Sequence, residues 1–101
     1  MNPLPIDDHS APLYTVGQVA DMLDVQPAFL RRLDAEEVVQ PARSEGGQRR
    51  YSRAEIVRIE RVSELTGEGL TLAGIRRLLA LEAELAEVRA ELAVERARRR
   101  R

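Results

Sequence analysis

Apolar side chains recur at intervals of three and four residues in several stretches of this 101-residue chain. That spacing places them on one face of an α-helix, whereas a half-buried strand would show strict alternation. Residues that favour turns separate the stretches, so most of the helices are short. Because about 100 residues are room for one domain, the pattern predicts a single, mainly α-helical domain.

The first two predicted helices lie close together in the sequence. Thr15 is a favoured helix-capping residue type, and the apolar positions that follow it span about two turns. Residues 24–25 then make a tight break, and Pro27 is a residue type favoured at the first position of a helix. We expect the second helix over 27–36. Two short helices joined by a turn of three or four residues form a helix-turn-helix unit.

Two adjacent glycines, Gly46 and Gly47, lie between two short runs of extended character at 42–45 and 48–51. A two-residue hairpin turn requires positive φ at its central residues, which glycine adopts without strain. The stretch therefore predicts a small β-hairpin after the two helices, in the position of a wing.

Two more helices are predicted after the hairpin. Ser52, with Glu55 three residues later, forms a capping box that opens the third helix. Gly67 and Gly69 end it, and Thr71 can cap the fourth helix. The apolar positions of these helices are Ile56, Val57, Ile59, Val62 and Leu65, and then Leu72, Ile75, Leu78 and Leu79.

A leucine-rich seam continues the fourth helix. Its members step by three, four, three and four residues and are Leu78, Leu81, Leu85, Val88 and Leu92. This is the a/d spacing of a coiled coil, and charged residues flank it. We expect the seam to pair two copies of the chain, although two heptads are too short to hold a dimer alone. Packing of the seam back onto its own domain is the alternative.

The charge balance is close to neutral, with 16 basic residues, all of them Arg, against 17 acidic ones. A basic surplus is typical of nucleic-acid-binding proteins, so the total alone disfavours that class. The distribution is uneven, however, because residues 1–25 hold four acids and no Arg, whereas 43–53 hold four Arg and one acid. Exclusive use of Arg also fits a GC-rich coding bias, but Arg is the side chain that forks onto phosphates and guanine edges.

The remaining composition excludes several kinds of site. Without cysteine there is no disulfide framework, thiolate zinc site, iron–sulfur cluster or redox thiol. The one histidine, His9, lies beside two acids in a proline-rich segment, which is a weak signal for a metal. We therefore expect no cofactor, no metal and no enzymatic activity. Neither a membrane span nor a secretory signal is apparent, so the expectation is a cytoplasmic protein.

The run LYTVGQVADMLDVQPAFLRRLDAEEVVQPAR, followed by SEGGQRRYS, resembles the N-terminal domain of MerR-family transcription regulators. The resemblance extends from about Leu13 to Leu79. Its landmarks are Tyr14-Thr15-Val16-Gly17, Leu30-Arg31, Pro41 with Arg43, and Arg49-Arg50-Tyr51. The segment EGLTLAGIRRLLALE, together with GGQRRYS, is most similar to the HspR subgroup of heat-shock repressors.

This resemblance implies a MerR-type winged helix-turn-helix with a β-hairpin wing and a C-terminal coiled-coil helix. We expect a flexible tail over 1–12, the DNA-binding domain over 13–79 and a dimerisation helix with an Arg-rich end over 80–101. The second helix would enter the major groove, and the wing would follow the phosphate backbone. An antiparallel coiled coil would pair two protomers on a palindromic operator. HspR-like repressors also suggest a chaperone of the DnaK type as a partner.

The candidate DNA contacts fall into three groups. The first turns of the second helix would reach base edges, through Gln26, Ala28, Phe29, Arg31 and Arg32. The wing region would meet phosphates, through Arg43, Arg49, Arg50 and Arg53. Thr15 and Tyr51 complete the set. The dimerisation residues are those of the leucine seam.

Structural alternatives accompany these assignments. Tyr51 is equally a candidate for the core anchor of the wing, and Phe29 for a core residue. The two arginines of the second helix can form a solvated face. The wing arginines can pair with Glu45 and Glu55 as surface bridges, which contribute little to stability.

The chain departs from the family pattern in its second helix. Arg31-Arg32-Leu33-Asp34 stands where family members usually have Arg-Tyr-Tyr-Glu. Glu37 stands at the helix end, where the family has a Gly that allows a left-handed turn. A residue with a side chain in that conformation costs on the order of 1 kcal/mol. Either the turn is rebuilt or the helix continues.

These observations predict a dimeric, sequence-specific transcription regulator without a ligand-sensing domain. Repression is the favoured mode of action, and we expect the protein to be associated with the nucleoid. Two alternatives use the same features. One is a small architectural or recombination-accessory helix-turn-helix protein, and the other is a coiled-coil adaptor that does not bind DNA.

Overall fold

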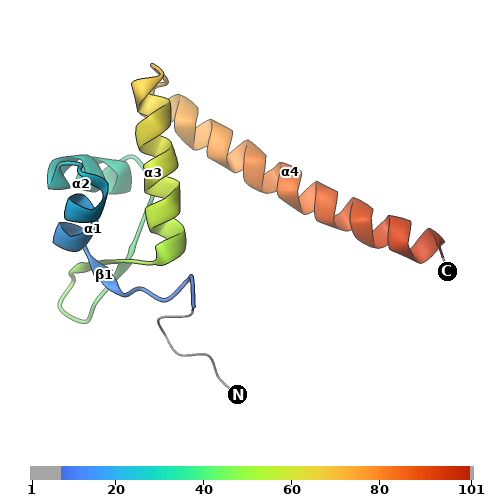
Figure 1. The fold of residues 1–101 in the computed structure, drawn as a ribbon, viewed down its shortest axis with the longest axis horizontal. Helices are drawn as coiled ribbons and strands as arrows, with labels where there is room; N and C mark the ends of the chain where they lie inside the picture. The colour runs from blue at the N-terminus through green and yellow to red at the C-terminus, as the bar shows by residue number, and fades with distance from the viewer. Residues whose placement is uncertain (1–7, 101) are drawn as a thin grey trace.

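The structure, a computed structural model, describes residues 8–100 (Figure 1). Three helices and a small sheet form a globular part, and the last helix projects from it toward the C-terminus. In chain order the elements are β1 (Tyr14–Thr15), α1 (Val16–Leu23), α2 (Pro27–Ala35), β2 (Ala42–Arg43), β3 (Arg49–Tyr51), α3 (Arg53–Gly67) and α4 (Leu72–Arg99). The predicted winged helix-turn-helix is confirmed, and the segment expected to form a coiled coil is a long helix.

The helix-turn-helix unit forms where the capping residues and Pro27 predict it. Thr15 begins α1 through a capping box, in which its Oγ1 accepts from the backbone N–H of Gln18. Asp24 ends the helix with a φ of 53°, a left-handed conformation that Asp tolerates better than most residues. Pro27 then starts α2, so the turn between the helices is only three residues long.

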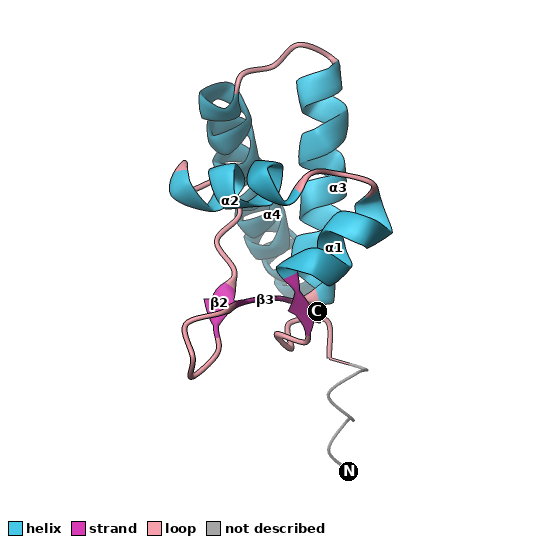
Figure 2. Cartoon of the chain, turned by 90° about the vertical axis from the view of Figure 1, so that its left-hand side faces the viewer, coloured by secondary structure: helices cyan, strands magenta, loops and turns pink. Residues whose placement is uncertain are grey.

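The wing is a hairpin of β2 and β3, and it hangs below α1 and α2 in Figure 2. Its turn differs from the predicted Gly-Gly turn, because only Gly47 has a positive φ, of 80°. The N–H of Gly47 donates to the Ser44 carbonyl, and the N–H of Ser44 donates to the Gln48 carbonyl. These bonds leave a three-residue loop, which needs one left-handed residue rather than two.

A third strand, β1, joins the hairpin and was not predicted. The sheet order is β1-β3-β2, with antiparallel pairs throughout. Tyr14 lies opposite Tyr51, and Thr15 lies opposite Arg50. A two-residue strand is too short to show an alternating pattern, so sequence periodicity carries no signal for it.

The last two helices begin as predicted, but the predicted domain boundary after residue 79 does not coincide with a helix end. Ser52 forms its capping box with Glu55, and Thr71 accepts from the backbone N–H of Gly74 at the start of α4. α4 then continues without a break for 28 residues. The predicted boundary between 79 and 80 therefore lies inside one helix, and the helix extends to Arg99.

The core lies where α1, α2, α3 and the first turns of α4 meet the sheet. Its largest fully buried side chains are Tyr51, Leu30, Leu33, Ile59, Ile75, Val19, Val39 and Val62. Two polar links hold α4 against the rest. Arg61 of α3 pairs with Glu82 at 2.6 Å, and Arg76 donates to the Glu36 carbonyl at the end of α2, at 3.1 Å.

The predicted tail contacts the domain over the part that the structure describes. The carbonyl of His9 accepts from the backbone N–H of Ala54, and the N–H of Leu13 donates to the Tyr51 carbonyl. Residues 8–12 are therefore joined to the start of α3 rather than separate from the domain. Residues 1–7 lie outside the described residues.

α2 ends in a left-handed turn although Glu37, and not a glycine, occupies the position. Glu37 adopts a φ of 59°. The N–H of Val38 donates to the Leu33 carbonyl, and that of Glu37 donates to the Asp34 carbonyl, which is the Schellman pattern of a helix end. The helix does not continue, so a side chain occupies a position that favours glycine.

A Glu37→Gly variant tests this strain. Glycine adopts the left-handed conformation freely, so the free energy of unfolding should rise by roughly 1 kcal/mol. Ala35→Gly, two residues earlier in a helical position, is the matched control and should lower that free energy by about 0.5–1 kcal/mol. Urea denaturation measures both, and a loss of stability in Glu37→Gly would contradict the account.

Candidate nucleic-acid interface

The exposed face of α2 carries most of the predicted base contacts. Leu30 and Leu33 point into the core and are fully buried. The opposite face is exposed and presents Gln26, Ala28, Arg31 and Arg32. Phe29 is half-buried and packs against the core. Much of its side chain is therefore part of the core, as the structural alternative proposes. α2 therefore has one anchored side and one side available to a partner.

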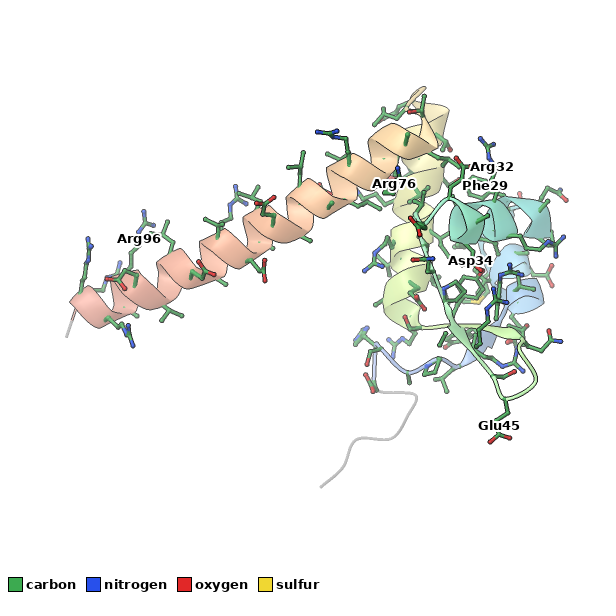
Figure 3. All side chains as sticks on the ribbon, turned by 180° about the vertical axis from the view of Figure 1, so that it is seen from behind. Phe29, Arg32, Asp34, Glu45, Arg76 and Arg96 are labelled. Carbon is green, nitrogen blue, oxygen red and sulfur yellow. The ribbon has the colours of Figure 1, made fainter. Side chains whose placement is uncertain are left out.

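Arg32 stands apart from the hairpin and points away from it (Figure 3). Its Nε donates to Glu36 at 2.8 Å, one helical turn further on. Both side chains are exposed, and exposed pairs at this spacing contribute little to stability. Arg32 is therefore held loosely and can exchange this partner for another anion.

Asp34 joins α2 to both strands of the wing. Its Oδ2 accepts from Nη2 of Arg43 at 2.9 Å and from Nε of Arg49 at 2.8 Å. The Asp34 side chain is only 13% exposed. The alternative that the wing arginines pair with Glu45 and Glu55 is not seen for these two, because their partner is Asp34 of α2.

The hairpin register explains why both arginines meet Asp34. Arg43 and Arg49 lie directly opposite each other, so their side chains share one face of the sheet. That face is turned toward α2, where Asp34 points down to it (Figure 3). Glu45 instead stands at the tip of the wing, and Glu55 uses its carboxylate in the capping box of α3.

Arg50 belongs to the other face of the sheet. It alternates with Arg49 along β3 and lies opposite Thr15 and Ala42. Its Nη1 donates to the Arg49 carbonyl at 3.1 Å, and no carboxylate pairs with it among the described ion pairs. Arg50 therefore lies on the sheet face opposite Arg43 and Arg49, and Arg53 is half-buried at the start of α3.

Tyr51 is a core residue. Its side chain is 0% exposed, and its Oη has no hydrogen-bond partner among the described residues. Burial raises the pKa of the phenol, and the nearby Asp34 and Glu55 add to this while Arg49 and Arg43 oppose it. The prediction of Tyr51 as a DNA contact is corrected by this burial, because the side chain anchors the wing and does not reach the surface.

Thr15 and the seam complete the predicted sites. The Oγ1 of Thr15 accepts from the Gln18 N–H in the α1 capping box, so its role here is structural. Leu78 is half-buried. The rest of the seam is exposed, from 46% at Leu92 to 59% at Leu81. Beyond Leu78, the seam residues do not pack back onto their own domain in this structure.

Asp34 is a site residue that the sequence does not predict. Its position is notable in the sequence only as a departure from the Glu of the family pattern. A signal was available, since a carboxylate one residue after the buried Leu33 lies at the edge of the core-facing side of α2. Such a carboxylate needs a cationic partner. Arg31 and Arg32 lie on the exposed side of the same helix, and the next arginine along the chain is Arg43 of the wing.

An open groove of about 620 Å³ lies between α3 and α4, with Val57, Leu79 and Ala83 among its lining residues. Within residues 8–100, no three His, Cys, Asp or Glu side chains gather as they would around a metal ion. None of the helices in that range is long and apolar enough to cross a membrane.

The comparisons with known proteins agree with this geometry. A family model described as MerR HTH family regulatory protein matches residues 14–82, which hold the sheet, α1 to α3 and the start of α4. The chain belongs to this MerR family. The family predicted from the sequence landmarks is thus confirmed.

Two curated relatives place the chain within the MerR family. The protein described as heat shock protein HspR from Streptomyces coelicolor is 37% identical over 83 residues, which cover 81% of this chain and 55% of HspR. The HTH-type transcriptional regulator GlnR of Bacillus anthracis is 29% identical over 76 residues, which cover 75% of this chain and 59% of GlnR. The chain spans a little over half the length of these relatives, and the likeness to HspR is confirmed.

Solved MerR-family structures share the fold. The N-terminal part of the Bacillus subtilis multidrug transporter activator Mta superposes with a TM-score of 0.63 at 27% identity, covering 84% of this chain and 86% of that chain. HiNmlR, a regulator lacking the sensor domain and solved bound to promoter DNA, superposes with a TM-score of 0.60 at 20% identity, over the same two shares. At that identity the second likeness shows the fold alone.

A Tyr51→Phe variant tests the core assignment of Tyr51. Removing a buried hydroxyl that lacks a partner should raise the free energy of unfolding by about 1 kcal/mol. The gain should grow above pH 10, because the unfolded phenol ionises near its ordinary pKa of about 10 while burial keeps the folded one neutral. Denaturation of both proteins at pH 7 and pH 10.5 measures this. A variant that is less stable would indicate a hidden partner of the hydroxyl.

Proposed function

We propose that this MerR-family chain is a dimeric, sequence-specific DNA-binding transcription regulator, acting as a repressor on a palindromic operator. The observation that carries the proposal is the exposed face of α2, which stands beside an arginine-rich wing and is held to it by Asp34. The helix and the wing together form one surface. The polar side chains of α2 suit the base edges of the major groove, and the arginines of the wing suit the phosphate backbone. Family membership and the fold of HiNmlR support the same reading.

The first turns of α2 supply the base contacts in this proposal. In a helix-turn-helix protein the N-terminal residues of the recognition helix reach base edges in the major groove. Gln26 suits adenine and Arg31 suits guanine, and a good bidentate pair contributes about 1–3 kcal/mol of discrimination. Ala28 and the exposed edge of Phe29 fit apolar contact with a thymine methyl group.

The wing supplies contacts that do not depend on sequence. Arg50 lies on the sheet face away from Asp34, beside Thr15, and Arg53 begins the next helix. Contacts from such arginines to phosphates release counterions and make binding sensitive to salt. They fix the register of the protein on DNA, while α2 selects the sequence.

The exposed seam of α4 supplies the dimer contact. Leu81, Leu85, Val88 and Leu92 form an apolar row on a helix that leaves the domain. An exposed row of this kind marks a protein interaction site, and its a/d spacing fits a second copy of the same helix. Two copies present two recognition helices, as a palindromic operator requires.

The likeness to HspR supports a place in the heat-shock response, with a chaperone of the DnaK type as a further partner and the nucleoid as the site of action. The architectural and adaptor alternatives remain distinct in behaviour. An adaptor would not retard DNA at low salt. An architectural protein would bend DNA or form arrays on repeated sites.

A comparison of Arg31→Ala with Arg50→Ala tests whether α2 makes the base contacts and the wing makes the phosphate contacts. Arg31→Ala should change which operator sequence is preferred, by about 1–3 kcal/mol at one base pair. Arg50→Ala should weaken binding to every duplex and lower the salt slope by about 0.9.

Electrophoretic retardation at several salt concentrations measures both effects. Arg58→Ala, an exposed arginine of α3 outside the proposed interface, is the matched control and should change neither property. If Arg50→Ala kept the wild-type affinity and salt slope, the wing assignment would be wrong.

A Leu85→Glu variant tests the dimer. A carboxylate on each of two facing helices should oppose pairing by lost apolar burial and by repulsion, so sedimentation should report a monomer. Ala86→Glu adds the same charge one residue off the seam and should leave the dimer intact. A dimer that survives Leu85→Glu would place the interface elsewhere.

A further inference from the structure

The Asp34 carboxylate is shared by two guanidinium groups that come from different strands. One oxygen, Oδ2, accepts from both Arg43 and Arg49 within 2.9 Å. The Arg49 side chain is 23% exposed and the Arg43 side chain 48%. The cluster is thus more enclosed on the β3 side and more open at β2.

These contacts differ from the exposed pair of Arg32 with Glu36 on the same helix. Hydrogen bonds between charged groups are roughly twice as strong as neutral ones. Solvent screening weakens them at exposed positions and much less where the carboxylate is largely buried. Leaving Asp34 without a partner would be costly, so its arginines are retained more firmly than Arg32 is.

The same contacts set the charge that the wing offers to DNA. Arg43 and Arg49 together carry a charge of +2. With the Asp34 carboxylate between them, the cluster has a net charge of +1. An arginine that donates to a carboxylate must give up that bond, or share it, before it neutralises a phosphate. Non-specific binding depends on the number of phosphates neutralised.

We infer that Asp34 is a specificity-determining positioning residue. It fixes the wing against α2 and withholds Arg43 and Arg49 from the phosphate backbone. Sequence-independent affinity is thereby kept low, and base contacts from α2 supply a larger share of the binding free energy. This inference rests on the proposed function and assigns to the two arginines a role opposite to the phosphate contacts expected from the sequence.

Asp34→Asn removes the carboxylate while keeping the size of the side chain. Released arginines should contact phosphates, each steepening the salt slope by about 0.9. Each released arginine should therefore increase, by about threefold, the factor by which affinity for random duplex falls between about 50 and 200 mM salt. Affinity for random duplex at low salt should rise, and the ratio of operator to random binding should fall. Fluorescence anisotropy on both duplexes measures these quantities.

Two controls separate this role from charge and from folding. Glu45→Gln removes the same charge from the wing tip, which points away from α2, and should leave the operator preference unchanged. Asp34→Glu keeps a carboxylate and should restore the wild-type slope. A folded Asp34→Asn with unchanged slope and ratio would overturn the inference, as would weaker binding to all duplexes with a lower slope.

Arg43→Ala decides the question if Asp34→Asn does not fold. A withheld arginine makes no phosphate contact, so its removal should leave the salt slope unchanged, whereas Arg50→Ala lowers it. A slope lowered by Arg43→Ala would overturn the inference. If the wild-type chain did not bind duplex DNA at low salt, the proposed function itself would fail. If the wild type bound and the Asp34 variants kept its salt slope and operator preference, only the inference about Asp34 would fail.

Discussion

The carboxylate of Asp34 is the contact on which the arrangement of helix and wing depends. It lies at the end of α2 and receives Arg43 and Arg49 from the two strands of the hairpin. A two-stranded hairpin is marginally stable alone, and this one has only short strands. Its position comes from Asp34 on one side, and from pairing with β1 and the buried Tyr51 on the other. Through these contacts α2 and the wing form one continuous surface.

Much of the fold could be predicted from the sequence because its signals are local. Capping residues and apolar spacing gave the helices, and the Gly-Gly pair gave a hairpin at the right place. What failed depended on contacts between distant residues. Strand β1 exists only because β3 pairs with it, and the pairing of both wing arginines with Asp34 follows from hairpin register. At the candidate site, the helical spacing predicts which residues of α2 are exposed, whereas the burial of Tyr51 is set by tertiary packing.

The long helix α4 joins two tasks that the sequence presented as separate segments. Its first turns bury Leu72 and Ile75 in the domain core, and the same helix continues into an exposed seam. Arg76 also donates to the end of α2, so the helix that would pair two protomers touches the recognition helix directly. Because one rigid element bears both contacts, the separation of two recognition helices would follow from the pairing of α4.

The near-neutral charge of the chain is consistent with a protein that discriminates among DNA sequences. Acidic residues such as Asp34 offset arginines on the face that would meet DNA, which limits binding to arbitrary duplex. Footprinting of the purified chain on genomic DNA tests this account most directly. Protection of one palindrome, with two half-sites about one helical turn apart, is the predicted result. Uniform protection, arrays on repeated sites, or no protection at low salt would contradict it.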